Sequence, residues 1–131
     1  MKGFALVSAI FLLVVIAALG VFAVTISTTQ QQDSTMDVLG ARAYQAAKAG
    51  IEWGSYQITK NAATCATLTS PTLPAGTQLS QFTVTLSCSS TTHTEGTNVF
   101  SVYQLTSIAT TGTVGTTAYF ERRLQVAIKY P

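Results

Sequence analysis

The sequence is poor in charge, and the charges that it has are scattered. Only 9% of the 131 residues are charged and the net charge at pH 7 is +2, whereas an average soluble domain has about 25% charged residues. No basic stripe is present that would hold a nucleic-acid backbone, so the sequence predicts no nucleic-acid partner. This composition is typical of a chain built partly for lipid, and we do not expect the full-length monomer to be soluble alone.

The residue types that build catalytic and metal sites are also scarce. The single histidine, His93, lies in STTHTEG, a threonine-rich stretch that predicts an exposed turn. Hydrolytic sites need a nucleophile, a base and an orienting acid brought together. We therefore predict no enzyme activity, no cofactor and no metal, with His93 and Glu95 solvated rather than holding a metal or sensing pH. The chain lacks a glycine-rich phosphate loop followed by lysine, so energy for any movement must come from another protein.

Two cysteines, Cys65 and Cys88, lie in the polar second half of the chain. No second cysteine or histidine pair stands nearby to complete a zinc site, so a disulfide between the two is the favoured interpretation. Such a bond forms in an oxidising compartment, which the chain reaches if its apolar beginning exports the rest. Closing a loop of about 24 residues is expected to stabilise the fold by roughly 3 kcal/mol.

The chain begins MKGFALVSAIFLLVVIAALGVFAVTIS, in which residues 4–26 carry no ionisable side chain. A helix of this length covers about 35 Å, slightly more than a hydrocarbon core. Removable signals have apolar regions of about 7 to 15 residues, so we expect this segment to be retained, although residues 21–23 form a weak cleavage site. Lys2 before the segment, and Asp33 with Asp37 behind it, favour a cytoplasmic N-terminus. An ordinary signal anchor remains an alternative.

Gly3 and Phe4, behind a leader of residues 1–3, resemble the beginning of a type IV prepilin. The resemblance implies that prepilin peptidase cuts between Gly3 and Phe4 on the cytoplasmic side and methylates Phe4, and that the apolar helix survives. Five residues into the mature chain stands Ser8, where major pilins carry glutamate. Ser8 cannot act as a counter-charge to a neighbour's N-terminus, and its hydroxyl is expected to bond its own helix backbone. Ser8 is either a tolerated small polar residue or the mark of a subunit in a terminal or initiating position.

The stretch ARAYQAAKAGIEWG, which follows Gly40, extends this resemblance. It is similar to the MshP-like proteins of the mannose-sensitive haemagglutinin (MSHA) pilus and to the related PilX-like minor pilins. The spacing of Cys65 and Cys88 is also reminiscent of that group. The resemblance implies an α+β fold in which one long N-terminal helix, transmembrane in its first half, packs on a small antiparallel sheet.

The resemblance also implies partners and a location. The partners are other pilin and minor pilin subunits, prepilin peptidase, and an inner-membrane assembly platform with a separate ATPase. Before assembly the chain would lie in the inner membrane, with its N-terminus cytoplasmic and its head periplasmic. After assembly it would lie in the pilus outside the cell.

The pattern along the rest of the chain places the remaining elements. Residues 27–60 contain no proline, so the helix is expected to continue as an amphipathic stretch beyond the membrane. After Lys60 the composition changes to threonine, serine, proline and glycine, which marks the beginning of a head at residues 61–131. Alternating apolar residues predict three antiparallel strands, with the last two joined by a turn at residues 111–117. The predicted strands are residues 81–88, 99–110 and 118–130.

Two adjacent faces of the helix are candidates for packing. The small-residue face comprises Ala46, Gly50 and Gly54, and the apolar face beside it comprises Ala47, Ile51 and Ile58. Either both faces pack beneath the chain's own sheet, or the small-residue face admits the helix of a neighbouring subunit. We expect the rings of Trp53 and Tyr56 to pack between helix and core.

Two neighbouring arginines on the predicted last strand, Arg122 and Arg123, point to opposite faces and do not form a shared phosphate clamp. Arg122 falls on the apolar face of that strand, so we expect it at the surface, where it lies at an edge of the sheet, snorkels, or pairs with Glu121 or with an acidic group of the next subunit.

The function predicted from these features is structural. We predict a minor pilin that helps to initiate or complete assembly of an MSHA-like type IV pilus after processing by prepilin peptidase. The alternatives are a pilus-tip adhesin that uses the threonine-rich segments 61–80 and 89–98, a type II secretion pseudopilin, and an ordinary single-span membrane protein.

Overall fold

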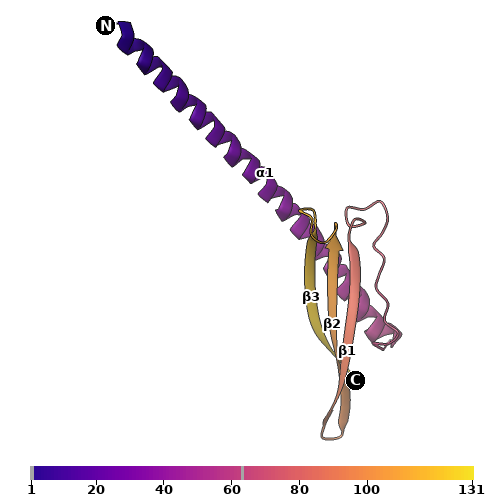
Figure 1. Ribbon diagram of the computed structural model, residues 1–131. Coiled ribbons are helices and arrows are strands. Elements are labelled where there is room, and N and C mark those ends of the chain that lie inside the picture. Colours follow the sequence, from indigo (N-terminus) through magenta and orange to yellow (C-terminus); the bar gives the residue numbers. More distant parts are fainter. Residues whose placement is uncertain (1, 63) are drawn as a thin grey trace. The chain divides into compact units, whose positions relative to one another are not determined.

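The computed structural model describes residues 2–62 and 64–131, and Met1 of the predicted leader lies outside them. One helix is followed by three strands (Figure 1). They are α1 (Lys2–Asn61), β1 (Thr83–Glu95), β2 (Asn98–Thr111) and β3 (Phe120–Tyr130). The chain divides into two compact units, Met1–Val38 and Leu39–Pro131, and α1 contributes to both.

The predicted continuation of the helix through its polar stretch is confirmed, because α1 has no break before Asn61. Threonine weakens a helix, but here its hydroxyls bond carbonyl oxygens one turn back. Thr25 Oγ1 donates to the Phe22 carbonyl at 2.8 Å and Thr35 Oγ1 to the Gln31 carbonyl at 3.0 Å. These bonds satisfy the threonine hydroxyl groups within the helix itself.

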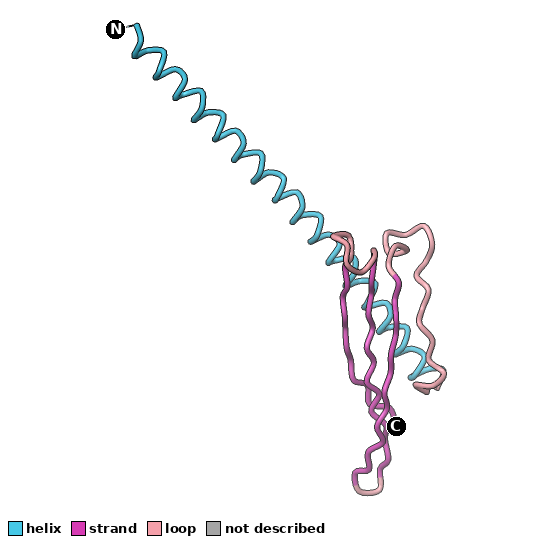
Figure 2. Tube along the Cα trace, viewed as in Figure 1, coloured by secondary structure: helices cyan, strands magenta, loops and turns pink. Residues whose placement is uncertain are grey.

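Within the second unit, the three strands form one antiparallel sheet in the order β1-β2-β3 (Figure 2). Val84 pairs with Ala109 and Leu105 pairs with Val126, which fixes the register across the sheet. The three predicted strands and their antiparallel arrangement are therefore confirmed. The fold class is α+β, a long N-terminal helix with an apolar first half together with a three-stranded antiparallel sheet.

The first hairpin differs from the sequence-based prediction, which ended the first strand at Cys88 and placed residues 89–98 in a loop. Instead β1 continues to Glu95, which pairs with Asn98 across a two-residue turn. Gly96 holds the first turn position with a φ of 62°, a conformation that tight hairpins favour at this place and that glycine adopts without strain. The prediction failed because serine and threonine replace the alternating apolar residues beyond Cys88, although a solvated strand needs no apolar face.

The core of the second unit lies between the C-terminal part of α1 and one face of the sheet, called the inner face below. Its central cluster is Ala43, Ala46, Ala47, Phe82, Val84 and Ala109, all buried. The inner face of β3 is half-buried and alternates with exposed residues, as its sequence predicted. Alanines and glycines on α1 bring the helix backbone close to the strands, so small side chains and not large ones fill much of this interface.

Candidate functional site

The apolar part of α1 in the first unit exposes all its large side chains. Phe4 is 82% exposed, Leu13 68% and Phe22 63%, and the least exposed large residue of the segment, Val15, is still 37% exposed. This helix is long and apolar enough to cross a membrane. Because so much apolar surface is costly in water, the segment is compatible with membrane anchoring.

The predicted cleavage site, Gly3 followed by Phe4, lies in the first turns of α1. A Cβ atom added at Gly3 would meet nothing within 4 Å, and the same is true of Gly20. Neither glycine has a positive φ. The fold therefore needs no glycine at position 3, where glycine costs a helix about 1 kcal/mol relative to alanine.

Ser8 is exposed within the apolar segment, with no charged residue near it in sequence beyond Lys2. In the described part of the chain its hydroxyl does not make the backbone bond that we predicted. That bonding occurs farther along α1, at Thr25, Thr28, Thr29 and Thr35. Ser8 is therefore an exposed, uncharged polar side chain, and no other polar side chain occurs in residues 4–21.

The small-residue face of α1 packs on the chain's own sheet in the second unit. A Cβ at Gly50 would collide with the Ser107 hydroxyl and lie 2.7 Å from Val84 Cγ1. At Gly54 a Cβ would lie 2.9 Å from Leu86 Cδ2 and 3.1 Å from Leu105 Cδ1. The prediction that this face packs beneath the chain's own sheet is therefore confirmed, and no room is left there for the helix of a neighbouring subunit.

The neighbouring residues of α1 follow only part of the prediction. Ala46, Ala47 and Ile58 are buried and Ile51 is half-buried, so the adjacent apolar face also contacts the head. The prediction was wrong for Tyr56, which is 54% exposed. A ring at this position points away from the sheet because it lies on the opposite side of the helix from the buried small residues.

Ser107 sits opposite Gly50 with its side chain fully buried and its hydroxyl without a hydrogen-bond partner among the described residues. An unsatisfied buried hydroxyl costs about 1 to 3 kcal/mol. We therefore expect Ser107→Ala to leave the free energy of unfolding unchanged or to raise it by about 1 kcal/mol. Urea unfolding of the full chain in detergent, followed by Trp53 fluorescence, measures this difference. A loss of more than about 1 kcal/mol would show that the hydroxyl is bonded in solution.

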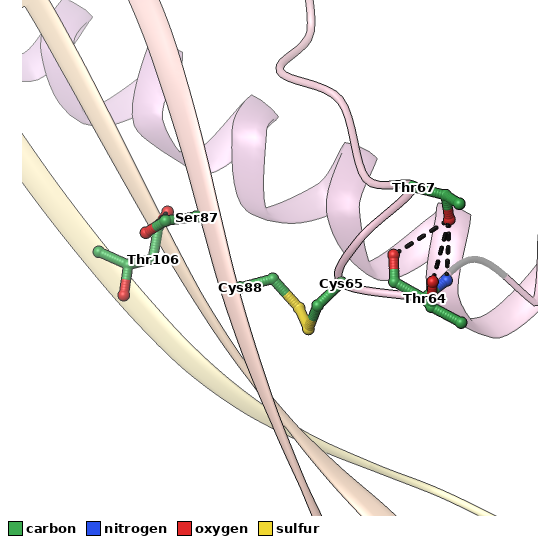
Figure 3. Close-up of a disulfide and its surroundings, with 6 residues drawn as sticks. All are labelled: Thr64, Cys65, Thr67, Ser87, Cys88 and Thr106. Carbon is green, nitrogen blue, oxygen red and sulfur yellow. Dashed lines mark hydrogen bonds between the residues drawn. A yellow bond between two sulfur atoms is a disulfide. The ribbon is translucent and has the colours of Figure 1, made fainter.

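The first half of the segment between α1 and β1 is bonded to both of these elements. Cys65 and Cys88 form a disulfide with Cα atoms 5.2 Å apart, as the sequence predicted (Figure 3). Trp53 Nε1 donates to the Thr69 carbonyl at 3.2 Å, and the Leu86 amide donates to Ser70 Oγ at 2.9 Å. The predicted packing of the Trp53 ring between helix and core is wrong, because the residue is 39% exposed and its indole N–H instead bonds this segment.

His93 lies in β1 and not in the predicted turn, directly opposite Phe100. The two rings stack with centroids 5.8 Å apart, and Lys129 Nζ lies 3.9 Å from the centroid of Phe100. Sequence reasoning missed this cluster because it needs the strand register. No group of three potential metal ligands occurs among the described residues.

Arg122 and Arg123 are exposed on β3, which is an edge strand, as predicted for Arg122. Arg122 pairs with Ala109 and therefore shares the inner face, whereas Arg123 lies on the outer face. Beside them, the Tyr119 hydroxyl donates to Glu121 Oε2 at 2.6 Å. This hydrogen bond raises the pKa of Tyr119 above its usual value.

Two shallow grooves mark the surface of the second unit. The larger, of about 310 Å³, runs between the segment after α1 and the beginning of β1, and the smaller, of about 140 Å³, lies on the outer face of the sheet. Hydroxyl and apolar side chains line the larger groove, and hydroxyl and amide side chains with the bonded Cys88 line the smaller, so neither has an ionisable group in its wall. Neither groove gathers the groups that a catalytic site needs.

Comparison with known proteins found no family model, curated protein or solved structure that matches this chain. The likeness to type IV prepilins therefore depends on the residues that carry it, Gly3, Phe4 and the stretch from Gly40 to Gly54.

Proposed function

We propose that this chain is a low-copy, pilin-like structural subunit that is anchored in the inner membrane by residues 4–26 and helps a type IV pilus to assemble. The observation that carries the proposal is the contrast between the two units. The first exposes a continuous apolar helix, whereas residues 39–131 have a core of their own. Residues 39–131 therefore form their core without the apolar helix. The surface of that helix is free to be covered first by lipid and then by helices of other subunits.

The glycine before Phe4 supports processing by prepilin peptidase. Gly3 fills no tight space and adopts no special backbone conformation, so packing does not account for it. Recognition by an enzyme that requires a small residue before the cut does account for it. Phe4, 82% exposed at the beginning of the helix, is then the new N-terminus and the residue that is methylated.

Ser8 supports a low-copy role. A buried glutamate at this place needs a cation from a neighbour, whereas a hydroxyl makes no such demand. A subunit with Ser8 can occupy a place where one side of its helix has no partner of the same kind. We place this subunit at the beginning of the filament, in contact with other pilin and minor pilin subunits and with the assembly platform and its ATPase.

Processing is tested on the chain purified from cells. Mass spectrometry is expected to show methylated Phe4 as the first residue, and a strain without prepilin peptidase should retain Met1. Gly3→Val is expected to block the cut, whereas Gly20→Val, at a glycine whose surroundings are equally open, should be processed normally. A first residue near Ala23, or an intact Met1 in the normal strain, would contradict the proposal.

The role in assembly is tested by deletion. An assembly subunit is needed for piliation, so we expect fewer fibres per cell. The tip adhesin is the second candidate, because the β1–β2 hairpin extends beyond its pairing with β3 and every residue of β1 from Ser89 to Glu95 is exposed. Unchanged fibre number with lost attachment would favour that candidate. A pseudopilin would affect secretion instead, and an ordinary membrane anchor would not respond to loss of the peptidase.

A further inference from the structure

The two edges of the sheet differ. The edge of β1 is partly covered, since Cys88 is bonded to Cys65 and the Leu86 amide already donates to Ser70 Oγ. β3 pairs only with β2, and its other edge has no strand beside it in the described residues. An edge of this kind offers unpaired backbone donors and acceptors to another strand.

The open edge of β3 carries charged side chains near both of its ends but none in its middle. Proteins protect edges with charged side chains, particularly those that point inward, and Arg122 on the inner face is of this kind. The five residues from Leu124 to Ile128 carry no charge and alternate between half-buried and exposed. They form a stretch that is suited to pairing.

We propose that a second copy of this chain pairs with this edge, β3 against β3 in antiparallel orientation, with the two-fold axis at Gln125. In an antiparallel pair, residues that stand opposite each other share a face of the sheet. Full overlap of Phe120–Tyr130 with its own copy centres on Gln125, and the result is one continuous six-stranded sheet. The facing pairs are then Glu121 with Lys129, Phe120 with Tyr130, and Leu124 with Val126.

The charges select this register. Glu121 of each copy faces Lys129 of the other, so the pair has two opposite-charge contacts on the outer face and two aromatic contacts on the inner face. A register centred on Val126 places Arg123 opposite Lys129, which is unfavourable. Parallel pairing in register places each arginine beside the same arginine of the other copy, which is also unfavourable because the charges repel. The register centred on Gln125 is therefore the one that combines full length with complementary charge.

The proposed dimer has a low affinity, and its two copies are antiparallel. Backbone bonding along one strand edge buries less than the roughly 1,200 Å² of the smallest stable interfaces. The helical segments 39–61 of the two copies run in opposite directions on the same side of the joined sheet. Neighbours that point the same way in a filament cannot form this pair, so the inference is independent of the proposed function, and failure of either leaves the other in place.

Disulfide trapping in the full chain in detergent micelles tests the register. With Gln125→Cys the introduced thiols stand directly opposite each other, with Cα atoms about 4.5 to 5.5 Å apart, which suits a disulfide. Ala127→Cys is the matched control, because residue 127 is also exposed on the same face but stands opposite Arg123, so that the Cα atoms of the two copies of residue 127 are roughly 13 Å apart. We expect Gln125→Cys to form the crosslinked dimer at least tenfold faster, with the bond located by mass spectrometry. Equal rates, or no crosslinked dimer with Gln125→Cys, would overturn the proposal.

Charge reversal provides an independent measurement. Glu121→Lys and Lys129→Glu each turn two attractive contacts into repulsive ones, and each is expected to raise the dimer dissociation constant about tenfold in sedimentation equilibrium. The double variant restores both contacts and should return within about threefold of the original value. The double variant, like the single ones, lacks the hydrogen bond from Tyr119 to Glu121 and the contact of Lys129 with the Phe100 ring. Rescue therefore comes only from contact between copies, and a double variant no better than the single ones would overturn the register.

Discussion

Gly50→Ala is expected to lower the free energy of unfolding of the second unit by about 2 kcal/mol. The added methyl group would collide with the Ser107 hydroxyl and lie 2.7 Å from Val84 Cγ1. Ser107 is able to rotate its hydroxyl away, but its Cβ is also close and valine is stiff at χ1, so the helix and the sheet must separate. This cost exceeds the gain of about 1 kcal/mol in helix propensity. Urea unfolding of the full chain in detergent, monitored by Trp53, the one tryptophan, measures the change.

Gly40→Ala is the matched control for this substitution. It lies on the same helix in the same unit, and its new Cβ would stand 3.5 Å from Phe120 Cζ, an ordinary contact. We expect it to stabilise the head by about 0.5 to 1 kcal/mol through helix propensity alone. Equal effects of the two substitutions would mean that α1 does not approach β2 as closely as the structure shows. Adding Ser107→Ala to Gly50→Ala should recover part of the loss, because it removes the nearest obstacle.

Replacing both Cys65 and Cys88 with serine is expected to cost about 3 kcal/mol of stability. The disulfide closes a loop of about 24 residues, and without it the unfolded chain regains that freedom. Apart from Leu73 and Leu79, which pack against the core, the segment is attached mainly by the bond from Trp53 to Thr69 and the bond from Leu86 to Ser70. We therefore expect the segment 66–81 to become the first site of proteolysis, and limited digestion with mass spectrometry will show it.

Two comparisons separate the disulfide from its surroundings. Reduction of the unmodified chain should reproduce the loss seen in the double serine variant. Ser70→Ala removes one hydrogen bond and leaves the bridge, so its cost should be only about 1 kcal/mol. Loss of less than about 1 kcal/mol on reduction would show that packing alone holds the segment on β1.

The larger elements were predictable because each has a strong local pattern. The apolar segment and the proline-free stretch after it predicted a long helix, which runs from Lys2 to Asn61. Alternation along β3 predicted the half-buried face that the structure shows, and the two cysteines predicted the one bridge. The hairpin was missed because residues 89–95 are solvated on both faces, and a strand without a buried face carries no periodic pattern.

By itself the sequence determined the apolar helix, the three strands and the disulfide. The helix and the strands follow from hydrophobic patterns that are local in the chain, and two cysteines allow only one pairing. Only the tertiary structure decided which surface the small residues of α1 contact, since Gly50 and Gly54 suit a neighbouring helix and a close sheet equally well. It also placed His93 beside Phe100 and put β3 at an edge of the sheet, with no further strand beside it among the described residues. These features depend on strand register and on the order of strands, which arise from contacts between residues far apart in the chain.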